Sequence, residues 1–157
     1  MISKIFLDMD GVIVNFRGQC EKFNCIKRND VNWDIVKRGG SEFWENMEWL
    51  PEGKEFFTWL IKICEEENID LYILSAVNYD AGKVGKINWL KQNTNINKHH
   101  IILTDTGEEK SYYADQDSVL IDDFKKNCEN FTQAGGKAIK YETPNMAQDE
   151  LLILIGK

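Results

Sequence analysis

The sequence lacks the features of a membrane-spanning or nucleic-acid-binding protein. It contains no run that approaches about 18 apolar residues, so we expect no membrane span. It has no basic excess either, because 26 acidic and 19 basic side chains give a net charge of −7. A nucleic-acid polymer and an anionic membrane both need a basic face, so neither is expected as the main partner. A small anionic ligand stays open if a bound cation offsets the acidic charge locally.

Signals for secretion and for disulfide bonding are also missing. The N-terminus enters "ISKIFLDMD" directly, without the basic segment and apolar stretch of a secretory leader. The four cysteines form no C-x-x-C pair, and a chain of 157 residues can bury a core without disulfides. We therefore expect reduced thiols and a cytoplasmic location. The length suits a single domain, residues 1–157.

Apolar blocks that alternate with helical patterns predict the fold class. The alternation favours an α/β fold, a doubly wound, Rossmann-like parallel sheet with helices on both faces. In such a sheet, ligands bind outside the carboxyl ends of the strands. The expected strands are residues 4–9, 69–76, 100–104, 117–123 and 137–142, and the expected helices are residues 52–68, 83–93, 125–135 and 147–155.

One stretch interrupts this alternation. Residues 15–50 show short helical patterns and no convincing strand. We predict that they form a small helical cap, inserted after the first strand and lying over its end. The core then comprises residues 1–14 and 51–157. The cap segment is rich in aromatic residues, namely Phe16, Phe23, Trp33, Phe43, Trp44 and Trp49.

Acidic residues end two of the predicted strands. Asp8 and Asp10 close the first strand, and Asp122 and Asp123 close the fourth. Because these strand ends gather at one edge of a parallel sheet, the carboxylates would share a crevice and repel one another. A divalent cation is the simplest way to hold them together. Oxygen ligands with few cysteine or histidine candidates favour Mg²⁺.

The first acidic pair suits two different roles in phosphoryl transfer. A carboxylate at Asp8 is placed to attack phosphorus in line and form an aspartyl-phosphate. Asp10 lies two residues further on, on the same side of an extended strand. It is placed to protonate the leaving oxygen and then to take a proton from the hydrolytic water. Gly11 would let the chain turn sharply beside the phosphate.

Phosphate-binding groups are expected at the second strand end and before the fourth strand. Ser75 offers a hydroxyl group, and its neighbour Ala76 offers a backbone N–H. A lysine is needed to offset the charge of the transferred phosphoryl group. Lys110 is the best placed, and Lys86 is its competitor. Each of these features alone has an ordinary structural explanation; an aspartate pair, for example, can cap a helix. Together, the order of the first acidic pair, the serine, the lysine and the second acidic pair along the chain favours one phosphoryl-transfer site.

At this point the chain resembles the haloacid-dehalogenase (HAD) phosphatases. The segments "DMDGV", "LYILSA" and "VLIDD", with Lys110, are similar to the four motifs of that superfamily, in the same order. The resemblance implies a Mg²⁺-dependent phosphomonoesterase that works through an aspartyl-phosphate. Within the superfamily, the chain is most similar to the 5′(3′)-deoxyribonucleotidases, through "DMDGVIVNF", "FW" at 43–44, "LPEG" at 50–53, "K-x-x-W" at 86–89, and "LIDD" followed by "GG" at 135–136.

The subfamily resemblance implies hydrolysis of (deoxy)ribonucleoside monophosphates to nucleoside and phosphate. It implies Asp8 as the nucleophile and Asp10 as the acid/base. It implies Mg²⁺ bound by Asp8, by the backbone carbonyl of Asp10, and by Asp122 and Asp123. It also assigns the phosphate to Ser75, Lys110 and a nearby Lys86, and the nucleoside to Phe16, Phe43 and Trp44, which can stack on a base.

Several alternatives stay open. The motif residues Ser75-Ala76 and the acidic stretch "TDTGEEK" before Lys110 depart from the usual family pattern, and the insertion is short. The same chemistry on another small phosphate ester, such as a sugar phosphate, is therefore the main alternative. The aromatic residues of the insertion can equally form its own core. A receiver domain is disfavoured by the motif order, and an inactive binding protein by the full set of catalytic residues. A homodimer stays open.

Overall fold

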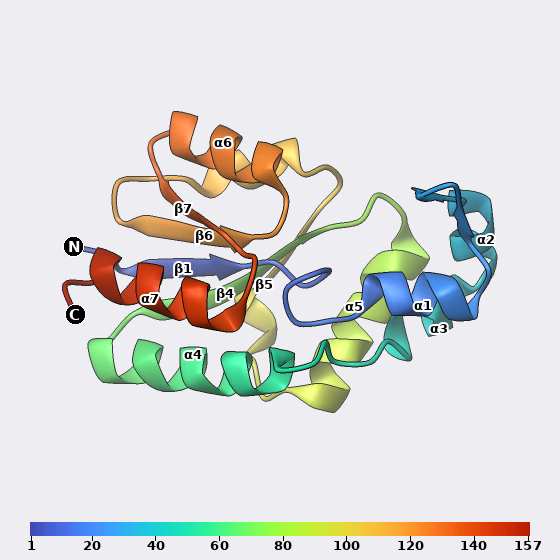
Figure 1. Ribbon diagram of the computed structural model, residues 1–157, viewed down its shortest axis with the longest axis horizontal. Coiled ribbons are helices and arrows are strands. Elements are labelled where there is room, and N and C mark those ends of the chain that lie inside the picture. The colour runs from blue at the N-terminus through green and yellow to red at the C-terminus, as the bar shows by residue number, and fades with distance from the viewer.

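A five-stranded parallel sheet forms the centre of the computed structural model, which describes residues 1–157 (Figure 1). The strand order is β5-β4-β1-β6-β7, and every neighbouring pair is parallel. The chain therefore winds outward from β1 in both directions, which confirms the predicted doubly wound α/β fold. The strands are β1 (Lys4–Leu7), β4 (Asp70–Ala76), β5 (Ile101–Thr104), β6 (Ser118–Asp122) and β7 (Lys137–Lys140).

Helices cover both faces of this sheet. Successive side chains of a strand point to opposite faces, so each face carries apolar side chains that a helix layer buries. On β1, Ile5 and Leu7 join the larger core cluster, which includes residues of α4, α5 and α7. Phe6 belongs to a smaller cluster on the other face, with Phe131 of α6. The elements that follow the core strands are α4 (Gly53–Glu67), α5 (Asp80–Asn93), α6 (Lys125–Gln133) and α7 (Pro144–Leu154), with short 3₁₀ helices η1 (Lys98–His100) and η2 (Glu108–Tyr113).

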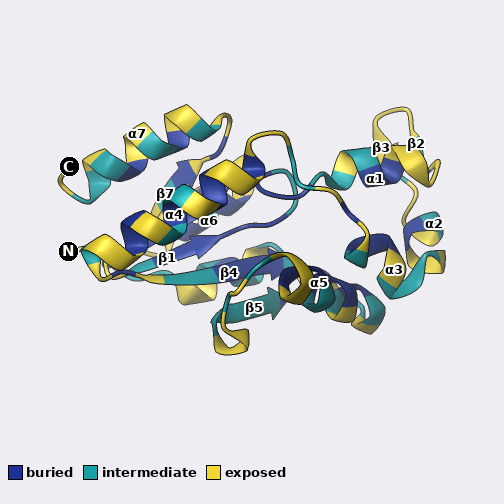
Figure 2. Ribbon diagram, turned by 90° about the horizontal axis from the view of Figure 1, so that it is seen from below, coloured by how far each residue is buried: buried dark blue, intermediate teal, exposed yellow.

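Residues of the central sheet are more buried than those on the outer faces of the helices. Every residue of β6 is buried, whereas α4 and α6 each have an exposed outer face. Figure 2 shows the exposed face of α4. The predicted strands agree with the observed ones to within two residues at each end, but two helix starts were predicted three residues too late. Helix α7 begins at Pro144, where the Thr143 side chain accepts from the Met146 N–H. A threonine cap followed by proline is a start signal that the apolar pattern alone does not reveal.

The segment of residues 15–50, called the insertion segment below, lies beyond the carboxyl end of β1 at one end of the molecule (Figure 1). Besides its helices it contains a small hairpin, which the sequence pattern did not predict because two-residue strands show no periodicity. The hairpin turn places Arg28 and Asn29 at positive φ, 53° and 69°. The elements are α1 (Phe16–Lys22), β2 (Ile26–Lys27), β3 (Asp30–Val31), α2 (Trp33–Arg38) and α3 (Gly40–Glu45).

Close packing of α3 on α5 joins the insertion segment to the core. A Cβ atom at Gly85 would lie 2.5 Å from the Ser41 carbonyl oxygen and 2.6 Å from the Trp44 Cβ, so only glycine permits this approach. The Trp89 indole N–H of α5 donates to the Met47 carbonyl oxygen at 2.8 Å. The insertion segment is thereby held directly over α5, where its aromatic side chains reach the carboxyl edge of the sheet.

Two sequence expectations can be compared with the structure directly. All four cysteines are buried and unpaired, as expected for free thiols: Cys20, Cys25, Cys64 and Cys128. None of the helices combines the length and the apolar character that crossing a membrane requires.

Candidate functional site

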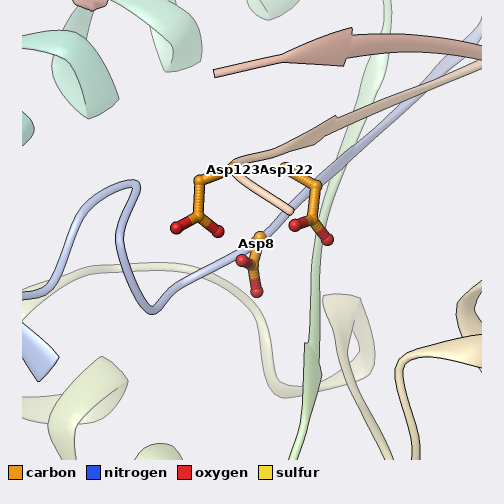
Figure 3. A group of neighbouring side chains, drawn as sticks. All are labelled: Asp8, Asp122 and Asp123. Atoms are coloured by element: carbon orange, nitrogen blue, oxygen red, sulfur yellow. The ribbon is translucent and has the colours of Figure 1, made fainter. Parts of the chain in front are cut away.

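Three carboxylates converge at the carboxyl end of the sheet. Asp8 directly follows β1, Asp122 is the last residue of β6, and Asp123 comes next (Figure 3). β1 and β6 pair in parallel register with Leu7 opposite Ile121, so the residues that follow lie side by side. One carboxylate oxygen from each aspartate lies within 4.8 Å of the others. The structure thus brings together three of the four predicted aspartates as a possible set of cation ligands.

Lys110 joins two of these aspartates. Its side chain comes from η2 and is almost fully buried, with 2% of its surface exposed. Its Nζ donates to Asp8 Oδ1 at 3.0 Å and to Asp122 Oδ2 at 2.7 Å. Burial by itself would lower the pKa of Lys110, but the two carboxylates outweigh burial and raise it. Lys110 is therefore a permanently charged ammonium group at the floor of the site.

The two adjacent aspartates of β6 have different environments. Both carboxylate oxygens of Asp122 accept hydrogen bonds. Oδ1 accepts from the Phe124 N–H at 2.9 Å. Oδ2 accepts from Asn127 Nδ2 at 3.1 Å and from Lys110 Nζ. Asp123 forms no ion pair. Desolvation of its carboxyl group and the charges of Asp8 and Asp122 raise the pKa of Asp123 to about 8. Asp123 is the exposed member of this pair, and its carboxyl group lies against that of Asp8 without a lysine partner.

Asn127 is a site residue that sequence reasoning missed. It lies in the first turn of α6, and its side-chain amide holds Asp122. The sequence signal that could have found it is its position five residues after an aspartate that ends a strand.

Gly11 is a second residue that this site requires. Its φ is +80°, and a Cβ atom at this position would lie 2.0 Å from Asp123 Oδ2. Glycine therefore allows both the turn after β1 and the position of Asp123.

Asp10 lies apart from the three-carboxylate cluster and has a lysine of its own. Its Oδ2 accepts from Lys86 Nζ at 2.8 Å, whereas its Oδ1 is buried with no hydrogen-bond partner. Lys86 is fully buried and also donates to Ser75 Oγ at 2.6 Å and to the Ala76 carbonyl oxygen at 3.1 Å. The predicted phosphate ligands Ser75 and Lys86 thus contact each other, and neither lines the cavity described next.

A cavity of about 1160 Å³ extends from these aspartates to the insertion segment. Asp8, Asp10 and Lys110 line its floor, together with Asp122, Asp123 and Ala76. Its other wall includes aromatic and basic side chains of the insertion segment, namely Phe16, Trp33, Trp44, Arg17 and Lys37. The cavity therefore joins the acidic cluster to an aromatic surface.

The aromatic wall differs in part from the prediction. Phe16 is stacked between Trp33 and Trp44, with ring centroids 5.7 Å and 5.4 Å away and interplanar angles of 23° and 12°. Phe43 is fully buried in the insertion segment and does not line the cavity, because it packs edge-on against Phe16, Phe23 and Trp44. Trp33, which was not assigned to the site, is 47% exposed and is the most accessible of the three stacked rings.

Comparison with known proteins yields structural matches only. No family model matches the chain, and no curated protein matches it. An uncharacterized protein from Corynebacterium glutamicum is similar over 99% of this chain and 96% of that one, with a TM-score of 0.56 and 18% identity. A hydrolase from Streptococcus pneumoniae is similar over 96% and 98%, with a TM-score of 0.57 and 8% identity.

A HAD family enzyme from Bacteroides thetaiotaomicron is similar over 90% of this chain and 95% of that one. Its TM-score is 0.54 and its identity 15%, and that structure is a complex with magnesium and inorganic phosphate. At these identities the likeness concerns the fold. The chain has the fold of a HAD family enzyme over nearly its whole length.

Proposed function

We propose that this chain is a Mg²⁺-dependent HAD phosphomonoesterase that hydrolyses nucleoside monophosphates through an aspartyl-phosphate. The main support is the arrangement of Asp8, Asp122 and Asp123 around one point, with the Lys110 ammonium group bound to two of them. Three carboxylates in partial burial repel one another, and the one lysine leaves them with a net negative charge. Such a site is suited to a divalent cation together with a phosphate ester.

The donor set fits Mg²⁺. The site offers carboxylate oxygens and no thiol or imidazole, which suits a hard cation. Asp8 and Asp123 would hold the ion, because both oxygens of Asp122 are occupied by hydrogen bonds. Asp122 would serve mainly to fix Lys110. When bound, Mg²⁺ neutralises charge on the phosphoryl oxygens.

The residues of the chain suit two successive displacements at phosphorus. In the first, an Asp8 carboxylate oxygen forms a bond to phosphorus while the ester P–O bond breaks, and Asp10 gives its proton to the leaving alkoxide oxygen. In the second, water attacks the aspartyl-phosphate and gives its proton to Asp10, while the bond between phosphorus and Asp8 breaks. Inorganic phosphate leaves and both carboxyl groups return to their starting states. Lys110 offsets the charge of the phosphoryl group throughout.

The aromatic wall of the cavity supports a nucleotide as the substrate. Within our proposal, the insertion segment acts as a cap over the phosphate site. Its Trp33 presents an accessible ring to the cavity, backed by Phe16 and Trp44. A planar base stacked on such a ring gains about 1–3 kcal/mol. The cavity volume of about 1160 Å³ is ample for a nucleoside monophosphate.

Substrate choice is tested with a panel of esters. We expect deoxyribonucleoside and ribonucleoside monophosphates to be hydrolysed with kcat/KM at least about tenfold above sugar phosphates, which corresponds to the energy of one stacked base. The measurement is phosphate release with Mg²⁺ present. The variant Trp33→Ala should lower this preference, whereas Trp59→Ala, outside the cavity, should not. Equal rates across the panel would remove the nucleotide assignment and favour the sugar-phosphate alternative.

Stability should depend on pH and on Mg²⁺ together. The pKa of Asp123 is raised to about 8, so its neutral form stabilises the metal-free fold at low pH, and this contribution is lost as the pH rises toward about 8. Mg²⁺ binds the ionised form, so the Tm increase that it causes should grow over the same range. Thermal unfolding with Mg²⁺ and with EDTA measures this increase. The same increase at about pH 5 and about pH 8 would contradict the expectation.

A further inference from the structure

We propose that Arg17 and Lys37 bind a second phosphoryl group of the substrate, so that nucleoside bisphosphates are the preferred esters. This inference rests on the proposed function, because it names the class of nucleotide that the proposed enzyme prefers. Both side chains belong to the insertion segment and line the cavity that reaches the acidic cluster. Neither residue was assigned to the site from the sequence.

The insertion segment presents only positive charge to this cavity. Residues 15–50 contain six acidic and six basic side chains, so the segment as a whole is neutral. None of its acidic side chains lines the cavity, whereas Arg17 and Lys37 do. The whole chain has a net charge of −7, so a cavity wall with positive charge alone is not a consequence of composition. Such a wall attracts an anionic group.

The two cations lie beside the stacked aromatic rings. Arg17 follows Phe16 in the first turn of α1, and Lys37 lies four residues after Trp33 on α2. Residues four apart share one face of a helix, so Lys37 and Trp33 are neighbours on the cavity side of α2. The Phe16 and Trp33 rings are stacked, with centroids 5.7 Å apart. A nucleotide whose base stacks on Trp33 therefore has both cations beside it.

Both cations keep hydrogen-bond donors for a ligand. Lys37 forms no ion pair, and its Nζ lies 5.6 Å from the ring centroid of Tyr79. Arg17 Nε lies 3.6 Å from Glu21 Oε1 in a pair that is about two-thirds exposed on each side, with side-chain values of 66% and 64%. That pair leaves the terminal N–H groups of the guanidinium, which can bind two phosphate oxygens at once.

The cavity has room for a second phosphoryl group. Its volume of about 1160 Å³ exceeds the roughly 300–1,000 Å³ of common small-molecule sites. The phosphoryl group that reacts already has a cation of the protein, Lys110, at the floor of the site. Arg17 and Lys37 are thus available to a second phosphoryl group on the same nucleoside. Hydrolysis of one ester bond of such a bisphosphate gives inorganic phosphate and a nucleoside monophosphate that keeps the second group.

Three esters of one nucleoside test this inference. With Mg²⁺ present, kcat/KM for thymidine 3′,5′-bisphosphate should exceed that for thymidine 5′-monophosphate and for thymidine 3′-monophosphate by at least about tenfold. A tenfold ratio is what one hydrogen bond to a charged group contributes. The ratio should fall as the salt concentration rises, because both cations are exposed.

Two variants separate the second phosphoryl group from the one that reacts. Arg17→Gln and Lys37→Met should each raise KM for the bisphosphate by about 3–10-fold with little change in kcat, since a remote contact acts alike on the bound substrate and the transition state. For both monophosphates, kcat/KM should change by less than about twofold. Arg38→Met is the matched control, because Arg38 is exposed on α2 and does not line the cavity. It should change none of the three rates.

The outcomes distinguish this inference from the proposed function. Equal kcat/KM for the three esters in the wild type would overturn the inference. So would a preference for the bisphosphate that survives in the double variant, or equal losses on the bisphosphate and the monophosphates, which would assign the two cations to the reacting phosphoryl group. No phosphate release from any of the three esters would instead refute the proposed function.

Discussion

Asp8→Asn is expected to abolish phosphate release. An amide nitrogen or oxygen cannot replace the carboxylate that forms the aspartyl-phosphate, so kcat should fall by at least about 10³-fold on every ester. Asparagine has nearly the same shape and removes one of three converging negative charges, so the fold should be retained. Phosphate release with Mg²⁺, together with circular dichroism and thermal unfolding, measures both effects.

The matched control for this variant is Asp70→Asn. Asp70 begins β4 at the amino end of the sheet, far along the strand from the site, and its replacement should leave kcat unchanged. A direct readout is the covalent intermediate, found by acid quenching and mass spectrometry as a phosphoryl group on the peptide that contains Asp8. Asp8→Asn with wild-type activity would rule out Asp8 as the nucleophile. A phosphoryl group on another residue would likewise assign the nucleophile to that residue and not to Asp8.

The close approach of the aspartates could be predicted from the sequence, because it follows from the order of the strands in the sheet. Asp8 and Asp122 end adjacent strands of a parallel sheet, and their separation follows from strand order and register. A strand pattern indicates where each strand ends, so residues at those ends can be brought together without knowledge of side-chain contacts. Lys110 was predicted instead from the chemistry, which needs a lysine, and its side chain reaches the carboxyl edge because η2 follows the end of β5.

The roles of Lys86 and Trp33 could not be predicted in this way. Lys86 lies on a helix, and which side of that helix faces Asp10 depends on the packing of α3 against α5 at Gly85. A sequence pattern shows neither the crossing of two helices nor the burial of a single lysine. The structure of the insertion segment is harder to predict from the sequence. Its hairpin strands have two residues each, and its aromatic residues both form its core and line the cavity.

Lys110→Met should be the most destabilising change at the site. It removes the ammonium group that is bound by Asp8 and Asp122 and leaves those carboxylates buried without a counter-charge. Breaking a buried ion pair from one side costs about 3–5 kcal/mol in the free energy of unfolding. Urea unfolding in EDTA measures this loss. Lys83→Met, which removes a more exposed partner of Asp105, is the control and should cost at most about 1 kcal/mol.

Mg²⁺ should restore part of this stability, because the ion brings positive charge back to Asp8. The free energy of unfolding of Lys110→Met should therefore rise more on adding Mg²⁺ than that of the wild type. Catalysis should not recover with it, since Lys110 is the ammonium group that contacts Asp8, and we expect kcat/KM to stay about 10²–10³-fold low. If Lys110→Met unfolds like the wild type in EDTA, the stability of the two carboxyl groups does not depend on the positive charge of Lys110. The lysine would then not be the counter-charge on which both the proposed metal site and the proposed phosphate site depend.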